Sequence, residues 1–249
     1  MKKFLAIITC LIVAIGVMGM TACGDSTFKG DYKEVDKETA SEFAAGVENY
    51  RGALDFENGM EFEFTMEGGS GASAFNIGIN CKSVYKNQQP SEMEGDFKTT
   101  ISGTTVKGDV YYSNGFIYMN QSGRKIKMAY DYDAYLSEMV GSGSAALITI
   151  QDVIAYVGAE NSVGSIKVYL DRGETVSKFK VEFNEFVLGG VKTDGEYYFV
   201  YDADGKLAAY KTDVKMTVSG TEASLYAVAK AYDGEISLPS DLDTYIQVS

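Results

Sequence analysis

Apolar and polar residues alternate along most of this chain, and that period of two limits the folds open to it. Met60, Phe62, Phe64 and Met66 alternate with acidic or hydroxyl residues. Because successive side chains of a strand point to opposite faces, this pattern predicts a strand with one buried face and one solvated face. The same period recurs in segments as far as residue 232. The sequence therefore predicts a sheet.

Short turn sequences separate the alternating segments. Asn114-Gly115 lies between two of them, and this dipeptide is typical of a two-residue hairpin loop. Ser122-Gly123 and Asp202-Ala203-Asp204-Gly205 occupy similar places. We count about eleven predicted strands, most of them joined by hairpins and therefore antiparallel.

Two segments follow a helical period instead. In residues 35–54, apolar residues recur at steps of three and four, which predicts an amphipathic helix. Residues 147–157 are apolar on most sides and predict a mostly buried helix within an insertion near 132–158. The preceding Gly141-Ser142-Gly143-Ser144 is rich in glycine, which suits a flexible joint.

The N-terminus has the pattern of a bacterial secretory signal. Lys2 and Lys3 precede an apolar run, and small residues lead into Cys23. This stretch resembles a lipobox, with Met20 where leucine is usual, and the resemblance implies a lipid on the Cys23 thiol. An uncleaved transmembrane helix is the alternative, because the run is long enough to span a bilayer. The small residues before a cysteine have no role in such a span, so we favour the lipoprotein signal.

These features divide the chain into three parts. We expect a signal peptide at 1–22, the lipidated cysteine with a tether at 23–34, and one domain at 35–249. The expected location is the cell membrane, with the protein anchored by lipid on its extracytoplasmic face. Removing residues 1–22 removes two of the 22 basic residues and none of the 35 acidic ones, which leaves a formal charge of −15. A charge of that sign argues against nucleic acid as a partner.

Residue composition also excludes several kinds of chemistry. The chain has no histidine, the commonest general base and a common metal ligand, so Ser-His-Asp triads and histidine-based zinc sites are excluded. Once Cys10 leaves with the signal and Cys23 carries lipid, Cys81 has no partner for a disulfide, and its apolar strand predicts a buried structural thiol. We expect no enzyme activity, no cofactor and no metal site.

Three further motifs favour structural interpretations over functional ones. Asp202-Ala203-Asp204-Gly205 is similar to part of a calcium loop, but Val200 and Lys211 stand at the first and last ligand positions, which favours a plain turn. Glu61 and Glu63 could form a glycosidase pair, yet a solvated sheet face explains them better. The 18 tyrosines could form a sugar-stacking platform, but aromatic residues also favour strands.

Several hairpin motifs resemble those of a known family. Residues 111–119 and 125–128, then 201–207, and the closing Leu238-Pro239-Ser240-Asp241-Leu242 look like the corresponding parts of LolA-like lipoproteins. This group includes the LolA and LolB lipoprotein carriers and the LppX and LprG lipid carriers. The resemblance implies a half-barrel whose concave face takes acyl chains, with helices as a lid.

The predicted sheet is too wide for its helices to cover. Eleven strands span roughly 50 Å, whereas one helix covers about 10 Å. A sheet of this width must curl, or something else must fill its apolar face. Small residues there, namely Gly108, Ala227, Ala229 and Ala231, with Gly78 nearby, leave room for a ligand or let helices approach closely.

We therefore predict a mainly-β fold with helical cover (α+β), built on a strongly curved antiparallel half-barrel sheet. The predicted ligand cavity is lined by Phe62, Phe64, Phe75, Ile77, Val110, Ile117, Met119, Met128, Val181, Phe183, Met216, Ala227 and Ala229. The predicted lid residues are Leu147, Ile150 and Ile154. The first functional hypothesis is a membrane-anchored protein that binds a lipid or a lipoprotein acyl chain. The alternative is a non-enzymatic surface module for a partner protein or an envelope polysaccharide.

Overall fold

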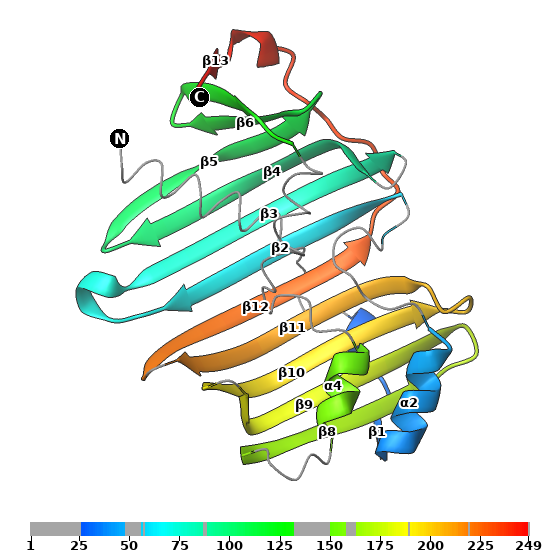
Figure 1. Cartoon of the computed structure of the whole chain (residues 1–249). Helices are drawn as coiled ribbons and strands as arrows, with labels where there is room; N and C mark the ends of the chain where they lie inside the picture. Colours follow the sequence, from blue (N-terminus) through cyan, green and yellow to red (C-terminus); the bar gives the residue numbers. More distant parts are fainter. Residues whose placement is uncertain are drawn as a thin grey trace.

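One thirteen-stranded sheet organises the computed structural model of this chain (Figure 1). The structure describes residues 26–47, 56, 58–86, 89–131, 150–157, 163–188, 190–218 and 220–248. The strands are β1 (Lys33–Val35), β2 (Gly59–Gly68), β3 (Phe75–Lys86), β4 (Gln89–Ile101), β5 (Thr104–Ser113), β6 (Phe116–Gln121), β7 (Arg124–Ala129), β8 (Val163–Arg172), β9 (Val176–Leu188), β10 (Val191–Asp202), β11 (Leu207–Val218), β12 (Thr221–Ala231) and β13 (Ile246–Gln247). Helices α2 (Lys37–Ala45) and α4 (Ile150–Tyr156) and three short 3-10 helices, η1 (Ser26–Phe28), η3 (Gly71–Ser73) and η4 (Leu242–Thr244), complete the described elements.

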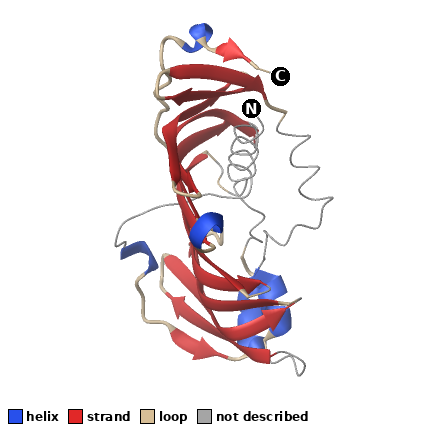
Figure 2. Ribbon diagram, turned by 90° about the vertical axis from the view of Figure 1, so that its left-hand side faces the viewer, coloured by secondary structure: helices blue, strands red, loops and turns tan. Residues whose placement is uncertain are grey.

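The strand order joins two runs of hairpins into one open sheet. Across the sheet the order is β1-β8-β9-β10-β11-β12-β2-β3-β4-β5-β6-β7-β13, so that β12 pairs with β2 in the middle. Neighbours are antiparallel except β13 and β7. The short strands β1 and β13 form the two edges, and the sheet does not close into a barrel. The predicted eleven strands correspond to β2–β12, and the predicted mainly-β curved sheet with helical cover is confirmed (Figure 2).

Strand register separates an apolar face from a polar face. One row across the central strands aligns Ala227, Phe64, Ile79 and Phe97, all at most 2% exposed. The adjacent row, on the opposite face, consists of Tyr226, Thr65, Gly78, Lys98 and Lys107. The strict period of two in the sequence thus produces one continuous apolar face.

The two glycines expected near the apolar face do not make room there. Gly78 belongs to the polar row, because it pairs with Thr65 and Lys98. Gly108 lies in phase with Phe97, but a Cβ at this position would come under 3.0 Å from the carbonyl oxygen of Asn120. The backbone of β6 therefore occupies the space that a side chain at Gly108 would take.

Helices α2 (Lys37–Ala45) and α4 (Ile150–Tyr156) lie on the concave side of the sheet, over β8–β10 (Figures 1 and 2). The Asp36 side chain caps α2 by accepting a hydrogen bond from the Thr39 backbone N–H at 2.8 Å. The predicted helices at 35–54 and 147–157 are observed over these shorter spans. Residues 48–55 and Leu147, with the predicted joint at 141–144, lie outside the described residues. None of the helices described here is long and apolar enough to cross a bilayer.

Candidate functional site

The apolar face has two halves of different composition, and the first is aromatic. Phe43 of α2 stacks on Phe179 of β9 with ring centroids 5.8 Å apart and planes 1° apart. Phe43 also meets the Tyr201 ring edge-on at 5.9 Å, and Tyr156 of α4 lies 6.0 Å from Phe186. The helices α2 and α4 therefore pack on aromatic side chains of β9 and β10 and complete a core in this half.

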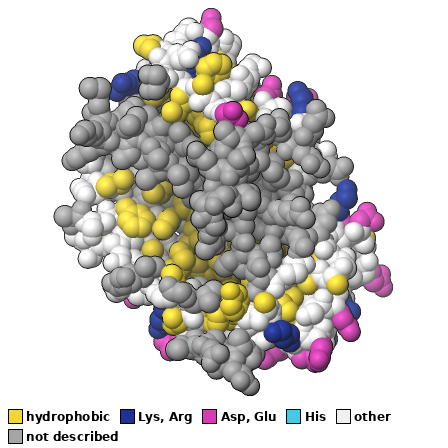
Figure 3. Space-filling model, viewed as in Figure 1, with side chains coloured by type: hydrophobic (Ala, Val, Ile, Leu, Met, Phe, Trp, Pro, Cys, Tyr) yellow, Lys and Arg dark blue, Asp and Glu magenta, His cyan; other side chains and the backbone are white. Residues whose placement is uncertain are grey.

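The second half of the apolar face, over β2–β7, combines phenylalanines such as Phe62, Phe64 and Phe97 with methionine and aliphatic residues. The methionines are Met60, Met66, Met93, Met119 and Met128, and the isoleucines are Ile77, Ile79, Ile117 and Ile126. Methionine side chains are unbranched and flexible, so they adapt to irregular apolar partners. Of the described α-helices, neither lies over these strands (Figure 1). Figure 3 shows hydrophobic side chains in several places on this side of the molecule.

The register brings all thirteen residues of the predicted ligand site to the apolar face. Nine are buried, whereas Phe75, Ile77, Met128 and Met216 are partly exposed. Val181 and Phe183 belong to the aromatic half, under the helices. Phe62 also borders a cavity on β2–β5, but that cavity is lined mainly by polar residues of the opposite face, so a ligand cavity on the apolar face stays a prediction.

The predicted lid residues lie in α4 as far as the structure describes them. Ile150 and Ile154 are 1% and 5% exposed. Side-chain hydrogen bonds hold α4 against α2: Gln151 Nε2 donates to the Ala44 carbonyl at 3.0 Å, and Lys37 Nζ donates to the Ala155 carbonyl at 3.1 Å. Helix α4 is therefore joined to α2 at one end of the sheet. Its predicted role in controlling access stays a prediction.

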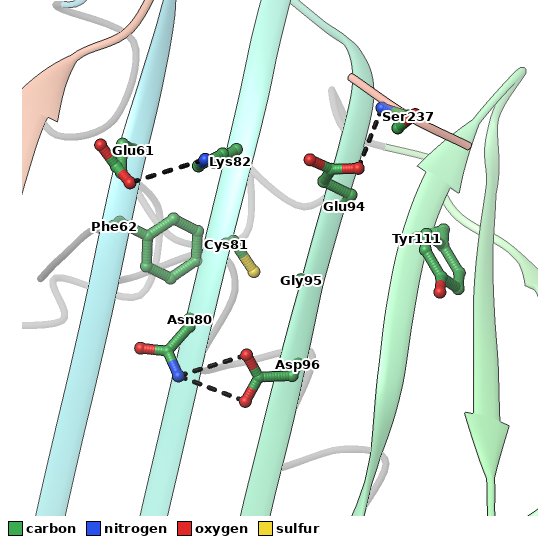
Figure 4. A pocket seen from close by; sticks show the side chains of 10 residues that line it. All are labelled: Glu61, Phe62, Asn80, Cys81, Lys82, Glu94, Gly95, Asp96, Tyr111 and Ser237. Atoms are coloured by element: carbon green, nitrogen blue, oxygen red, sulfur yellow. Dashed lines mark hydrogen bonds and ion pairs between the residues drawn. The ribbon is translucent and has the colours of Figure 1, made fainter. Parts of the chain in front are cut away.

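A polar cavity of about 360 Å³ opens on β2–β5 (Figure 4). Its charged groups already have partners within the chain. Asp96 accepts from Asn80 Nδ2 at 3.2 Å, Glu94 accepts from the Ser237 N–H at 2.9 Å, and Glu61 lies 3.9 Å from Lys82. Each of these carboxylates therefore has a hydrogen-bond or ion-pair partner within the chain.

Two further cavities lie at the margins of the sheet. One, of about 380 Å³, borders the Asp202–Gly205 turn, where Asp202 Oδ1 accepts from the N–H groups of Asp204 and Lys206, each at 2.9 Å. These bonds are those of a plain turn. The other, of about 490 Å³, lies along β4–β6. Within the described part of the chain, no group of three or more Cys, Asp or Glu side chains could hold a metal ion.

Cys81 is buried, as its strand pattern predicted. Burial, with a smaller effect of the Asp96 charge, raises the pKa of its thiol well above the usual value. A raised pKa keeps the thiol protonated at neutral pH, and the protonated thiol is a poor nucleophile.

The polar face of β8–β12 carries a network that the sequence analysis missed. Lys180 lies 2.6 Å from Glu196 and 3.3 Å from Glu182, and its Nζ stands 4.6 Å from the centre of the Tyr169 ring. Lys211 stands between the Tyr198 and Tyr226 rings, at 5.3 and 5.6 Å. The available signal was spacing: Lys180 and Glu182 stand two residues apart, as do Glu196 and Tyr198, so each pair shares one face of its strand. It became meaningful only when the register placed these residues side by side.

Comparisons with known proteins identify no family for this chain. No family model matches it, and no curated protein matches its sequence. Among solved structures, LprF from Mycobacterium bovis is 9% identical, with a TM-score of 0.38 over 82% of this chain and 97% of that one. A β-barrel-like protein from Brucella abortus, with a domain of unknown function named DUF1849, is 8% identical, with a TM-score of 0.16 over 71% and 98% of the two chains.

Proposed function

We propose that this chain is a lipid-anchored, non-enzymatic protein on the extracytoplasmic face of a bacterial membrane, and that it binds an acyl chain of a lipid or lipoprotein. The apolar face of β2–β7 is the proposed binding surface. The anchor is the proposed lipid on Cys23.

One observation carries the proposal: the helices α2 and α4 both lie over the aromatic half of the sheet. Six strands, β2–β7, span roughly 29 Å, and their apolar face carries methionine, isoleucine and phenylalanine side chains, most of them buried. An acyl chain has no groups that need hydrogen-bond partners, so a surface of adaptable apolar side chains suits it. The buried polar residues on this face of β3 and β4, Ser83 and Thr99, are neutral and suit no charged headgroup.

Ligand binding is tested with two adjacent substitutions on β2. Met66→Gln places an amide on the apolar face, whereas Thr65→Gln places the same amide on the polar face. We expect Met66→Gln to weaken binding of a fluorescent fatty acid by about tenfold, because an unpaired buried amide costs about 1–3 kcal/mol. Thr65→Gln should bind as the parent protein does.

Native mass spectrometry of the gently extracted protein supplies the second measurement. We expect bound acyl lipid, displaced by added fatty acid. A protein that carries no bound lipid and binds neither added lipids nor fatty acids would contradict the proposal. That result would favour the surface-module alternative.

The anchor is tested separately through Cys23→Ala. We expect the parent protein to incorporate labelled fatty acid and to fractionate with membranes. Cys23→Ala should remain unprocessed or appear in a soluble fraction, whereas the matched Cys81→Ala control should be processed normally. Unchanged labelling of Cys23→Ala would refute the anchor.

A further inference from the structure

The residues that follow the proposed anchor are folded onto the polar face of the sheet. We call residues 26–35 the N-terminal strap. It begins at η1 over β10, passes β9 and β8, and becomes edge strand β1. Helix α2 follows directly, on the opposite face (Figure 2). Most of the segment expected to be a tether is therefore part of the domain.

Aromatic side chains hold the start of the strap to β10. Phe28 is 8% exposed, and its ring meets the Tyr198 ring edge-on at a centroid distance of 6.1 Å. Tyr32 meets the same ring edge-on at 5.8 Å, and its hydroxyl donates to the Phe28 carbonyl at 3.1 Å. Burial, followed by the charges of Asp171 and Glu196, raises the pKa of Tyr32, so this phenol stays protonated. The two rings enclose Tyr198 from the solvent side.

Polar contacts fix the rest of the strap to β8 and β9. Lys178 Nζ donates to the Lys29 carbonyl, and the Asp31 N–H donates to the Asp171 carboxylate at 3.2 Å. A Cβ at Gly30 would come under 3.0 Å from the same carboxylate, so glycine permits this approach. Glu34 pairs with Lys167 at 2.9 Å where β1 meets β8. The strap is thus bound at both ends and in its middle.

The strap sets how far the sheet can stand from the anchor. Cys23 precedes Ser26 by three residues, and three residues reach at most about 10 Å. We propose that the N-terminal strap holds the polar face of β8–β11 against the membrane surface, so that the apolar face opens away from the membrane that carries the anchor. This inference rests on the proposed lipid at Cys23.

The chemistry of the polar face suits contact with zwitterionic headgroups. Tyrosine is enriched at membrane–water interfaces, and Tyr169 and Tyr226 occupy this face. Its lysines Lys167, Lys180 and Lys211 are paired with carboxylates. Because the face has little unpaired positive charge, its contact with the membrane would not depend on anionic lipids. The acidic chain as a whole would repel such lipids.

The orientation is measured with fluorophores on three exposed positions of the full-length lipoprotein in phosphatidylcholine vesicles. The labelled variants are Asp213→Cys on the polar face of β11, Thr105→Cys on the polar face of β5, and Ser41→Cys on α2. Acylation blocks the Cys23 thiol, and Cys81→Ala removes the remaining one. β5 lies five strands from β11, about 24 Å away across the sheet. A quencher attached to lipid headgroups reports proximity to the membrane.

We expect quenching at position 213 to exceed that at positions 105 and 41 by at least about twofold, given the 10 Å reach of the anchor. Inserting ten Gly-Ser residues between Asp25 and Ser26 adds a flexible spacer of about 17 Å and should abolish the difference. Phe28→Ala with Tyr32→Ala should reduce it by undocking the strap. Both variants keep the anchor and the sheet.

The outcomes separate this inference from the proposed function. Equal quenching at all three positions, or strongest quenching at position 41, would overturn the orientation while leaving the anchor and the ligand proposal standing. Absence of lipid on Cys23 would overturn the anchor and the orientation together. A spacer variant that keeps the parent's pattern would show that something other than the strap sets the orientation.

Discussion

A glycine in the central sheet provides a sensitive test of how β3 and β4 pack. Gly95 in β4 pairs with Cys81 in β3. An added Cβ at Gly95 would come under 3.0 Å from both the Asn80 carbonyl oxygen and Cys81 Sγ, which real Cβ atoms essentially never do. Gly95→Ala therefore forces β4 to move relative to β3.

The expected cost follows from the atoms that Gly95→Ala meets. Overpacking a well-packed core costs about 1–3 kcal/mol, and we expect the upper part of this range because one clash is with backbone. Gly78, in the neighbouring β3, is the matched control: its Cβ would meet its nearest atoms at 3.8 and 3.9 Å, which is ordinary contact. Gly78→Ala should be neutral or should stabilise by about 0.4–1 kcal/mol, because it restricts the unfolded chain.

Urea unfolding of the two variants measures the difference directly. Gly95→Ala should lower the midpoint without changing the slope of the transition, and Gly78→Ala should not lower it. Adding Cys81→Ala should give little rescue of Gly95→Ala, because the Asn80 carbonyl remains in place. If the two glycine variants are equally stable, or if Cys81→Ala restores stability fully, the reasoning from backbone contact is wrong.

Three further predictions concern ionisation and access. Burial alone would raise the pKa of Glu196, but hydrogen bonds from Lys180 and Tyr198 outweigh it and lower that pKa. Its contribution to stability should therefore be present at neutral pH and be lost as the pH falls below about 4.5 through the lowered pKa, a dependence that Glu196→Gln should weaken in acid unfolding curves. Cys81 should react with a thiol reagent at pH 8 far more slowly in the folded protein than in urea, and fast reaction of the folded protein would contradict its burial. Ile154→Gln should speed hydrogen exchange in α4 and leave ligand binding on β2–β7 unchanged, because α4 packs over β8–β10; weakened ligand binding would instead identify α4 as a lid.

Local sequence patterns were enough to predict the hairpins and the faces. Asn114 and Gly115 have φ angles of 52° and 76°, the positive values that a two-residue type I′ hairpin needs, and they join β5 to β6 as expected. The period of two likewise assigned Phe62 and Val110 to one face, although these residues lie far apart in the chain. Both signals depend only on neighbouring residues, so one sequence contains them in full.

Features that depend on distant pairing could not be predicted in the same way. Edge strands β1 and β13 have three and two residues, too few to show any period. Phe28 and Tyr32 stand in a short polar segment, and nothing near them in sequence indicates that Tyr198 is their partner. Gly78 and Gly108 were judged by their apolar neighbours, whereas the backbone of the strand alongside decides how much room each has.

The same limit explains why the alternation predicts a fold more firmly than a function. A strand face that is covered by a helix and a strand face that binds a ligand need the same apolar residues at the same spacing. Composition offers a second signal: rings of β9 and β10 contact α2 and α4, whereas the β2–β7 face combines rings such as Phe62, Phe64 and Phe97 with five methionines and four isoleucines. Rings pack in preferred geometries against fixed partners, as Phe43 does on Phe179, while methionine tolerates partners of variable shape. That contrast favours a permanent core in the first half and an exchangeable acyl chain in the second.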